Sequence, residues 1–145
     1  MENLIVRPLI EDDFDTLPEI DEESLGKNRW DYWEKKRDQF ITQPSPISFV
    51  AEMEGQIVGL ILGDVSSWEF GIPDTMGWIE TILVKPAYRK KGVAKALVHA
   101  LIERMKTKGV KTVYTLVTWD DWDLLQFFHS IGFTKGEMIH LELRI

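Results

Sequence analysis

Residues 84–97 read VKPAYRKKGVAKAL and join an apolar segment to a stretch with helical spacing. Three cations, Arg89, Lys90 and Lys91, are followed by Gly92, which has no side chain and lets a ligand approach the backbone closely. If a helix begins here, its free N–H groups and the positive end of its dipole favour a bound phosphate. Taken alone, the stretch predicts either a phosphate-binding turn or a solvated basic turn before an ordinary helix.

The segments around this turn predict two strands joined through a helix. Residues 77–84 and 112–117 have strand character, and residues 92–107 carry apolar side chains three and four positions apart. Such a unit makes a right-handed crossover between parallel strands, and ligands bind near the carboxyl ends of those strands. We therefore expect a site at Val84 and the turn after it. The predicted buried helix face consists of Ala94, Leu97, Val98, Leu101, Ile102 and Met105.

The N-terminal part predicts two further helices. The acidic run at residues 11–13 suits the positive end of a helix that buries Phe14 and Leu17, and Pro18 leaves the end of that helix open. A second helix is predicted over residues 29–41. The predicted buried stripe of this helix is Trp30, Trp33, Phe40 and Ile41. Two prolines, Pro44 and Pro46, are predicted to stop the helix.

The remaining segments complete one sheet with helices around it. A tight turn at Glu54-Gly55 predicts an antiparallel hairpin, and Gly132 stops the last helix. The order of strands and helices favours a single mixed sheet flanked by helices. The segments are strands at 4–7, 48–53 and 56–65, a helix at 121–131, and a final strand on which Ile139, Leu141 and Leu143 alternate.

Composition indicates a folded, acidic chain without cysteine. Of its 145 residues, 44% are hydrophobic and 28% are charged, which predicts one globular domain over residues 1–145. The net charge of −7 argues against nucleic acid and anionic membranes as partners and favours a cationic one. The absence of cysteine excludes disulfides, thiolate zinc sites and a cysteine nucleophile. We expect a cytoplasmic protein, because no segment reads as a signal peptide or a membrane span.

Arg89, Gly92 and Ala94 match a six-position motif of Gln or Arg, two residues, Gly, one residue, then Gly or Ala. Placed after an apolar strand and at the start of a helix, this motif resembles that of the GCN5-related N-acetyltransferase (GNAT) family. The stretch Phe127–Phe133 also resembles the later helix of that family and its Gly-Phe ending. The resemblance follows the order of elements along the whole chain and is strongest from Trp78 to Phe133.

The resemblance implies an α/β fold (α+β in some schemes): a single mixed, mostly antiparallel β-sheet with a central splayed parallel strand pair, flanked by about four helices. This is the acyl-CoA N-acyltransferase fold. It also implies an enzyme that transfers acetyl from acetyl-CoA to a primary amine, either a small cationic metabolite or a protein lysine or N-terminus. Backbone groups of Leu83 and Val84 would hold the pantetheine arm, beside a bulge that splays the two parallel strands. The pyrophosphate would bind the N–H groups of Lys91, Gly92, Val93, Ala94 and Lys95, with added charge from Arg89, Lys90 and Lys91.

Catalysis by direct transfer needs a base that deprotonates the amine, and Glu80 is the candidate. It lies in an otherwise apolar strand, where an acid is costly to bury unless it is paired, hydrated or functional. Family members that acetylate amines and aminosugars place a carboxylate there. The alternative is a structural acid that faces solvent or pairs with a lysine. Direct transfer needs no metal, and no cluster of carboxylates or cysteines accompanies the histidines, so we expect none.

Two features leave alternatives open. Many family members supply a tyrosine acid on the last helix, where this chain has Phe128, so an acyl-CoA-binding sensor or interaction domain without catalysis is the second hypothesis. The loop at residues 66–76 contains Trp68, Glu69 and Phe70 and either receives a cationic acceptor or packs against the protein or a second subunit. The sequence does not show whether edges pair into a homodimer.

Overall fold

The computed structural model describes residues 3–43 and 47–145. The predicted helix stop at Pro44 and Pro46 therefore lies outside the described residues. The chain divides into two compact units, one that ends at Thr115 and one that begins at Leu116. Each unit is described in turn.

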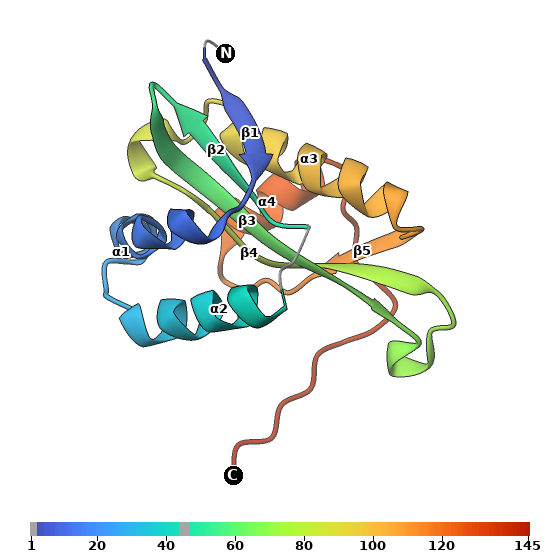
Figure 1. The fold of residues 1–145 in the computed structure, drawn as a ribbon. Helices are drawn as coiled ribbons and strands as arrows, with labels where there is room; N and C mark the ends of the chain where they lie inside the picture. Colours follow the sequence, from blue (N-terminus) through green and yellow to red (C-terminus); the bar gives the residue numbers. More distant parts are fainter. Residues whose placement is uncertain (1–2, 44–46) are drawn as a thin grey trace. The chain divides into compact units, whose positions relative to one another are not determined.

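The first unit contains a mixed, mostly antiparallel sheet, as the sequence predicts (Figure 1). Neighbouring strands are antiparallel except for β4 and β5, which are parallel and joined through a helix. This parallel pair stands at one end of the order, because no described segment pairs with β5 on its other side. The strands lie in the order β1 (Ile5–Pro8), β2 (Phe49–Met53), β3 (Gln56–Ser67), β4 (Thr75–Val84) and β5 (Thr112–Thr115).

Helices cover both faces of this sheet (Figure 1). Leu60 and Leu62 of β3 pack with α1 and α2 in one apolar cluster, so these two helices cover one face. A Cβ placed on Gly59 or Gly63 would instead meet Val93 or Leu101, so α3 covers the opposite face. The helices are η1 (Glu11–Asp15), α1 (Leu17–Leu25), α2 (Trp30–Thr42) and α3 (Val93–Thr107), with shorter turns η2 (Glu69–Gly71) and η3 (Pro86–Tyr88).

The hairpin between β2 and β3 confirms the prediction from Glu54-Gly55. Both residues have positive φ, 56° and 77°, the conformation of a type I′ turn, whose twist matches that of the strands. The helix predicted from the acidic run is divided into η1 and α1. Pro18 lies in the first turn of α1, where its missing N–H costs no helical hydrogen bond, and does not end the helix.

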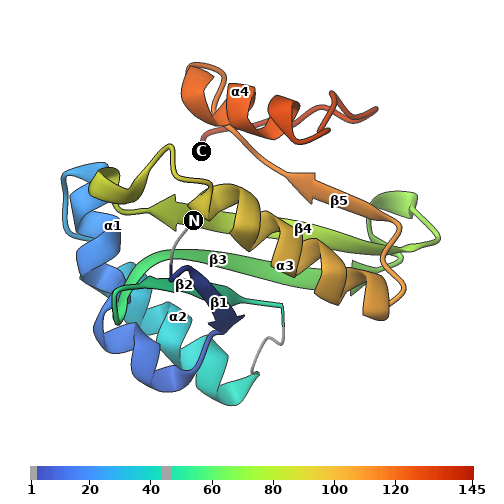
Figure 2. The same ribbon diagram turned by 90° about the horizontal axis from the view of Figure 1, so that it is seen from above.

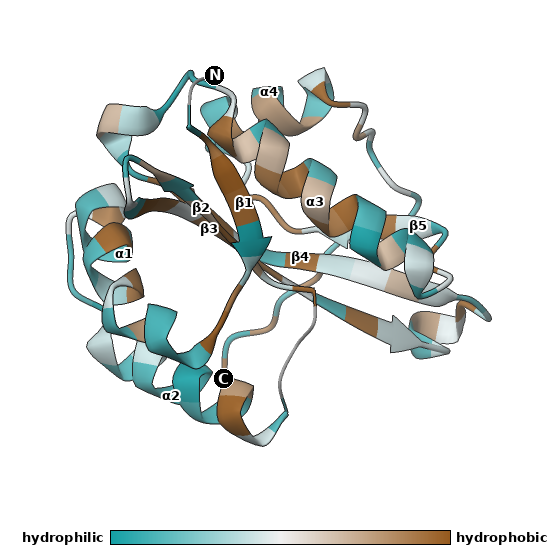
Figure 3. Cartoon of the chain, turned by 45° about the horizontal axis from the view of Figure 1, so that its top comes forward, coloured by the Kyte–Doolittle hydropathy of each residue, from teal (hydrophilic) through white to brown (hydrophobic). Residues whose placement is uncertain are grey.

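The buried stripe of α2 is narrower than predicted. Trp33 is 2% exposed, but Trp30 is 49% and Ile41 is 52% exposed, so the prediction is wrong for these two residues. They lie at the first and the next-to-last position of α2. Most of α2 is hydrophilic in Figure 3, in keeping with a helix that buries only a narrow face.

A buried carboxylate fixes the orientation of α2 against α1. Asp21 is fully buried and accepts hydrogen bonds from Trp33 Nε1 at 2.8 Å and from Arg29 Nε and Nη2 at 2.8 and 2.9 Å. The hydrogen bond to Asp21 raises the pKa of Arg29, so this guanidinium remains charged. The buried carboxylate thus has its hydrogen-bond partners, and three hydrogen bonds join it to Trp33 of α2 and to Arg29, the N-cap of that helix.

Asp21→Ala is expected to lower the free energy of unfolding by about 3–5 kcal/mol, because it leaves the Trp33 N–H and the Arg29 charge without a partner. Asp15→Ala serves as the matched control, since Asp15 also pairs with an arginine, Arg37, but is exposed. Exposed pairs of this kind contribute little to stability. Urea unfolding followed by circular dichroism measures both variants. Equal losses in the two would contradict a structural role for the buried contact.

The second unit contains α4 (Trp122–Ser130). Its N-cap, Asp121, accepts a hydrogen bond from the Leu124 N–H at 3.2 Å, and Gly132 has a φ of 102° just after the helix ends. The ring of Phe128 lies 5.2 Å from that of Phe127 and 4.9 Å from that of Phe133. The predicted last helix is therefore confirmed.

The predicted final strand is wrong, because residues 134–145 form no strand. A strand needs a neighbour that satisfies its N–H and C=O groups, and no described residue pairs with Ile139, Leu141 or Leu143. The alternation of apolar side chains gives this segment the sequence pattern of a strand, but no described segment pairs with it. Throughout residues 3–43 and 47–145, no helix has the length and apolar character that would let it cross a membrane.

Candidate functional site

The site is built around an extra residue in β4. Leu62 of β3 pairs with Thr81, and the next residue, Gly63, pairs with Ile79, so Glu80 is inserted between two paired positions. This is a β-bulge, a feature that re-aims side chains and is common beside active sites. Glu80 and Thr81 both face α2. The hydroxyl oxygens of Thr81 and Tyr32 lie 3.3 Å apart, and Glu80 forms an ion pair with a lysine of α2.

Directly before the bulge, β4 and β5 stop pairing. Their register runs from Met76 opposite Thr112 to Ile79 opposite Thr115 and goes no further. Figure 2 shows β5 diverging from β4 toward the carboxyl end of both strands. The edge of β4 from Glu80 to Val84 has no partner strand among the described residues, so its backbone groups can bond an extended ligand.

The basic turn ends at a helix N-terminus with free donors. Gly92 is the N-cap of α3 with a φ of 80°, and the first N–H bonded within the helix is that of Ala96, to the Gly92 carbonyl at 3.0 Å. The N–H groups of Val93 and Ala94 precede it and have no acceptor inside the helix, as at every helix start. Lys90 is also left-handed, with a φ of 61°, which costs an L-residue roughly 1–2 kcal/mol. The turn therefore has a conformation that suits an anion.

The side chains of the basic turn have separate roles. Arg89 Nε donates to the Val84 carbonyl at 3.2 Å and ties the turn to the end of β4. The Lys91 Nζ lies 5.7 Å from the centroid of the Tyr88 ring, and the Tyr88 hydroxyl accepts a hydrogen bond from Gln56 at 3.1 Å. Arg89 thus has a structural contact in addition to the charge that the sequence predicts. Lys90, Lys91 and Lys95 are exposed.

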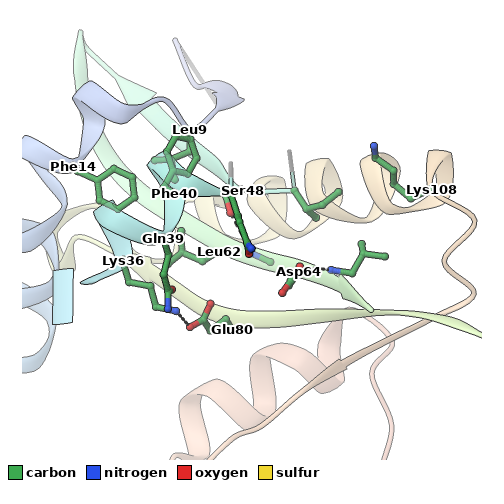
Figure 4. A pocket seen from close by; sticks show the side chains of 14 residues that line it. Leu9, Phe14, Lys36, Gln39, Phe40, Ser48, Leu62, Asp64, Glu80 and Lys108 are labelled. Atoms are coloured by element: carbon green, nitrogen blue, oxygen red, sulfur yellow. Dashed lines mark hydrogen bonds and ion pairs between the residues drawn. The ribbon is translucent and has the colours of Figure 1, made fainter. Parts of the chain in front are cut away.

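A cleft of about 560 Å³ opens on the α2 side of the sheet beside the bulge (Figure 4). Its apolar wall includes Phe40 and Leu62, and its polar groups include Lys36, Asp64 and Glu80. Glu80 forms an ion pair with Lys36, as the dashed line in Figure 4 marks. The alternative reading of Glu80 as an acid paired with a lysine is therefore what the structure shows, although the pair lines a cleft.

A second acid and an aromatic cluster lie next to Glu80 on the sheet. Asp64 of β3 is directly opposite Trp78 of β4, and its carboxylate accepts a hydrogen bond from the Val65 N–H at 2.8 Å. The Trp78 ring lies 5.1 Å from the Tyr114 ring and 6.2 Å from the Phe70 ring. Carboxylates beside aromatic faces are a suitable environment for a cation.

The loop between β3 and β4 is shorter than predicted, because the strands extend to Ser67 and from Thr75. Trp68 and Phe70 at its tip are 74% and 70% exposed, and both have positive φ, 63° and 52°. Left-handed aromatic residues are uncommon and indicate a constrained loop. Through its contact with Trp78, Phe70 connects this loop to the aromatic cluster.

Sequence reasoning missed Lys36 and Asp64. Lys36 falls three residues after Trp33 and four before Phe40, so a lysine on the predicted apolar stripe of this helix is the signal that could have found it. Asp64 is an acid at the end of the apolar run GLILGD, a signal of the same kind as that of Glu80. Among residues 3–43 and 47–145, no three His, Cys, Asp or Glu side chains gather as metal ligands would.

Comparisons with known proteins agree with this geometry. The profile described as "Acetyltransferase (GNAT) family" matches residues 8–133. The chain is 26% identical over 97% of its length to the uncharacterized N-acetyltransferase MJ1207 of Methanocaldococcus jannaschii, and it spans 65% of that protein. It is 22% identical to acetyltransferase ECA0875 of Pectobacterium atrosepticum, over 97% of this chain and 94% of that one.

Its fold is shared with a solved structure of the aminoglycoside N-acetyltransferase AAC(6')-Iy in complex with a bisubstrate analogue of CoA and acetylneamine. The TM-score is 0.83, with 16% sequence identity over 99% of both chains. The fold and these matches define the class as the acetyl-CoA-dependent N-acetyltransferases. The chain belongs to the acetyltransferase (GNAT) family, as the resemblance of its basic turn predicts.

Proposed function

We propose that this protein transfers acetyl from acetyl-CoA directly to a primary amine bound in the cleft beside α2. The observation that carries the proposal is the position of Glu80, which is the bulged residue of β4 at the point where β4 and β5 part and which lines the cleft. A base at this place lies between a free strand edge on one side and a cleft lined by two carboxylates and two lysines on the other. The two substrates of an acetyl transfer need such neighbouring sites.

The free edge of β4 and the turn after it fit the donor, which is a substrate consumed at each turnover. Backbone groups of Leu83 and Val84 would hold the extended pantetheine arm. The N–H groups from Lys91 to Lys95 would hold the pyrophosphate, because the helix start leaves donors free and Gly92 keeps the approach open. The cations Arg89, Lys90 and Lys91 would add attraction, although exposed side chains contribute little each.

Glu80 would act as the general base. An ammonium group is not a nucleophile, so the bound amine must lose a proton before it attacks the acetyl carbon. The Glu80 carboxylate accepts that proton directly or through one water, and the departing thiolate of coenzyme A takes one from solvent. A base of this kind contributes roughly 100- to 10⁴-fold to the rate.

The carboxylates in the lining of the cleft support a cationic acceptor, and two lysines, Lys36 and Lys108, also line it. Two carboxylates, Glu80 and Asp64, lie on adjacent strands, and the Trp78 and Tyr114 rings extend the same side of the sheet. The net charge of −7 adds a long-range attraction for cations. A small cationic amine, or a lysine or N-terminus presented by a peptide, satisfies these groups.

Replacing residues 68–74 with Asn-Gly should change which amines are acetylated and leave acetyl-CoA affinity within about twofold. Ser67 and Thr75 are paired, so a two-residue turn can close the hairpin. The loop touches the aromatic cluster through Phe70, whereas the donor turn is at the other end of β4. Ratios of kcat/KM across an amine panel and calorimetric titration of acetyl-CoA measure the two effects. Unchanged ratios would mean that the loop only packs against its surroundings.

The second candidate is an acyl-CoA-binding sensor of the same fold. Phe128 favours it, because the phenyl ring packs between two other phenyl rings and carries no proton to donate to a leaving thiolate. Incubation with acetyl-CoA and the amine panel, followed by detection of released thiol, separates the two functions. Binding of acetyl-CoA without turnover of any amine would support the sensor and overturn the enzyme.

A further inference from the structure

Lys36 occupies the place that an acceptor amine would need. Its Nζ contacts the Glu80 carboxylate directly and lies 5.5 Å from the centroid of the Tyr32 ring. The side chain of Lys36 is 18% exposed, so most of it is enclosed by the cleft. A base must be within hydrogen-bond reach of the proton that it removes, and Lys36 meets this requirement with a primary amine of the protein itself.

We propose that Lys36 is a self-acetylation site, modified in its own active site by the acetyl-CoA bound to the same chain. The inference rests on the proposed function, because it uses the same donor and the same base. The flexible four-carbon stem of a lysine allows its Nζ to move from Glu80 toward the free edge of β4. Held beside the base, this amine reacts at a far higher effective concentration than a lysine on the surface.

The step balances without a further reactant. The Lys36 ammonium gives one proton to Glu80 and attacks the thioester carbonyl through the freed lone pair. A C–N bond forms and the C–S bond breaks. The nitrogen loses its second proton, one proton leaves with the coenzyme A thiol, and the other passes from Glu80 to solvent. The products are Nζ-acetyl-Lys36, free coenzyme A and one released proton.

Acetylation would change the charge of the cleft. The Lys36 side chain becomes neutral and can no longer form an ion pair, so Glu80 loses its cationic partner. Lys108 also lines the cleft, but it comes from the end of α3, and no contact joins it to Glu80. The modified cleft then presents the carboxylates of Glu80 and Asp64 to an incoming cation. Self-acetylation would therefore prepare the site for an external cationic amine.

The experiment incubates the full chain with isotopically labelled acetyl-CoA and follows labelled peptides by mass spectrometry. Lys36 should gain one acetyl group, about 42 Da for the unlabelled group. Its rate should exceed that of Lys106 by at least about tenfold, because bound reactants have a high effective concentration. Lys106 is the matched lysine, since it also pairs with a glutamate, Glu103, but on the exposed side of α3. The first-order rate should not depend on protein concentration.

Three variants complete the test. Glu80→Gln should slow labelling of Lys36 by about 100-fold and leave Lys106 unchanged. Gly92→Glu should reduce the labelling rate of Lys36 to that of Lys106, since acetyl-CoA no longer binds. Lys36→Arg keeps the charge beside Glu80 and should gain no label at position 36, because a guanidinium stays protonated. Equal labelling of Lys36 and Lys106, or a rate that rises with protein concentration, would overturn the proposal.

The same reactions separate this inference from the proposed function. Release of thiol with external amines while Lys36 remains unlabelled would overturn self-acetylation and leave the enzyme function standing. Label on Lys36 without turnover of any amine would support self-acetylation and overturn the external acceptor. Calorimetric binding of acetyl-CoA with neither reaction would overturn both.

Discussion

Gly92→Glu is expected to abolish measurable binding of acetyl-CoA. The φ of Gly92 is 80°, a conformation that costs an L-residue about 1–2 kcal/mol. The new carboxylate would also stand where the free N–H groups of α3 start, so it would compete with the pyrophosphate for the same donors. Together these effects should weaken binding by about 100-fold or more, since each 1.4 kcal/mol is tenfold in affinity. Isothermal titration calorimetry measures the loss.

Two control variants separate the effect of backbone strain at position 92 from the effect of the new carboxylate on acetyl-CoA binding. Gly92→Ala adds the conformational cost without a carboxylate, so it should weaken binding less than Gly92→Glu. Gly109→Glu places the same residue at another glycine of positive φ, 79°, just after α3 with open space around its Cβ. It should leave acetyl-CoA affinity unchanged. Retained affinity in Gly92→Glu would refute the assignment of the basic turn to the pyrophosphate.

Glu80→Gln is expected to lower turnover by about 100-fold or more while acetyl-CoA affinity stays nearly the same. Glutamine keeps the shape of the side chain and an oxygen that can accept from Lys36, but it cannot take a proton. The loss should be greatest at low pH, where more of the acceptor is protonated and a base is needed most. At high pH the amine is already neutral, so the variant should approach the wild type.

Glu103→Gln is the matched control, because Glu103 also pairs with a lysine, Lys106, but on an exposed helix face. It should leave both turnover and pH profile unchanged. The measurement is thiol release against pH for a fixed amine, together with calorimetry of acetyl-CoA. An unaltered turnover in Glu80→Gln would remove the glutamate from the mechanism and return it to a structural ion pair.

The sequence pattern predicted those elements that depend only on residues close together in the chain. The type I′ turn at Glu54-Gly55 and the helix start at Gly92 each depend on a few residues with a marked conformational preference, so both are confirmed by positive φ values. The buried face of α3 repeats with the period of a helix, since its buried residues are Val93, Leu97, Val98, Leu101 and Met105. These features do not depend on which other segment lies beside them.

Features that depend on strand register, or on a segment distant in the sequence, could not be predicted from the local sequence in this way. The extra residue in β4 does not change the apolar character of the strand, so the pattern did not place Glu80 at the bulge. The role of Lys36 depends on how α2 lies over the sheet, and that is set in part by the contact of Asp21 with Trp33. The failed strand at residues 139–143 has the right alternation but no described partner.

The hydrogen bond from Arg89 to the Val84 carbonyl connects the basic turn to the end of β4, the strand that also carries Glu80. Glu80 is four residues back on the same strand, roughly 13 Å away at 3.3 Å per residue. A thermal displacement of β4 therefore carries the donor turn and the base together, so the spacing between the two reactants changes little while the surrounding loops move. A core substitution that displaces β4 should therefore lower acetyl-CoA affinity and turnover together, even when the substituted residue is distant from both sites.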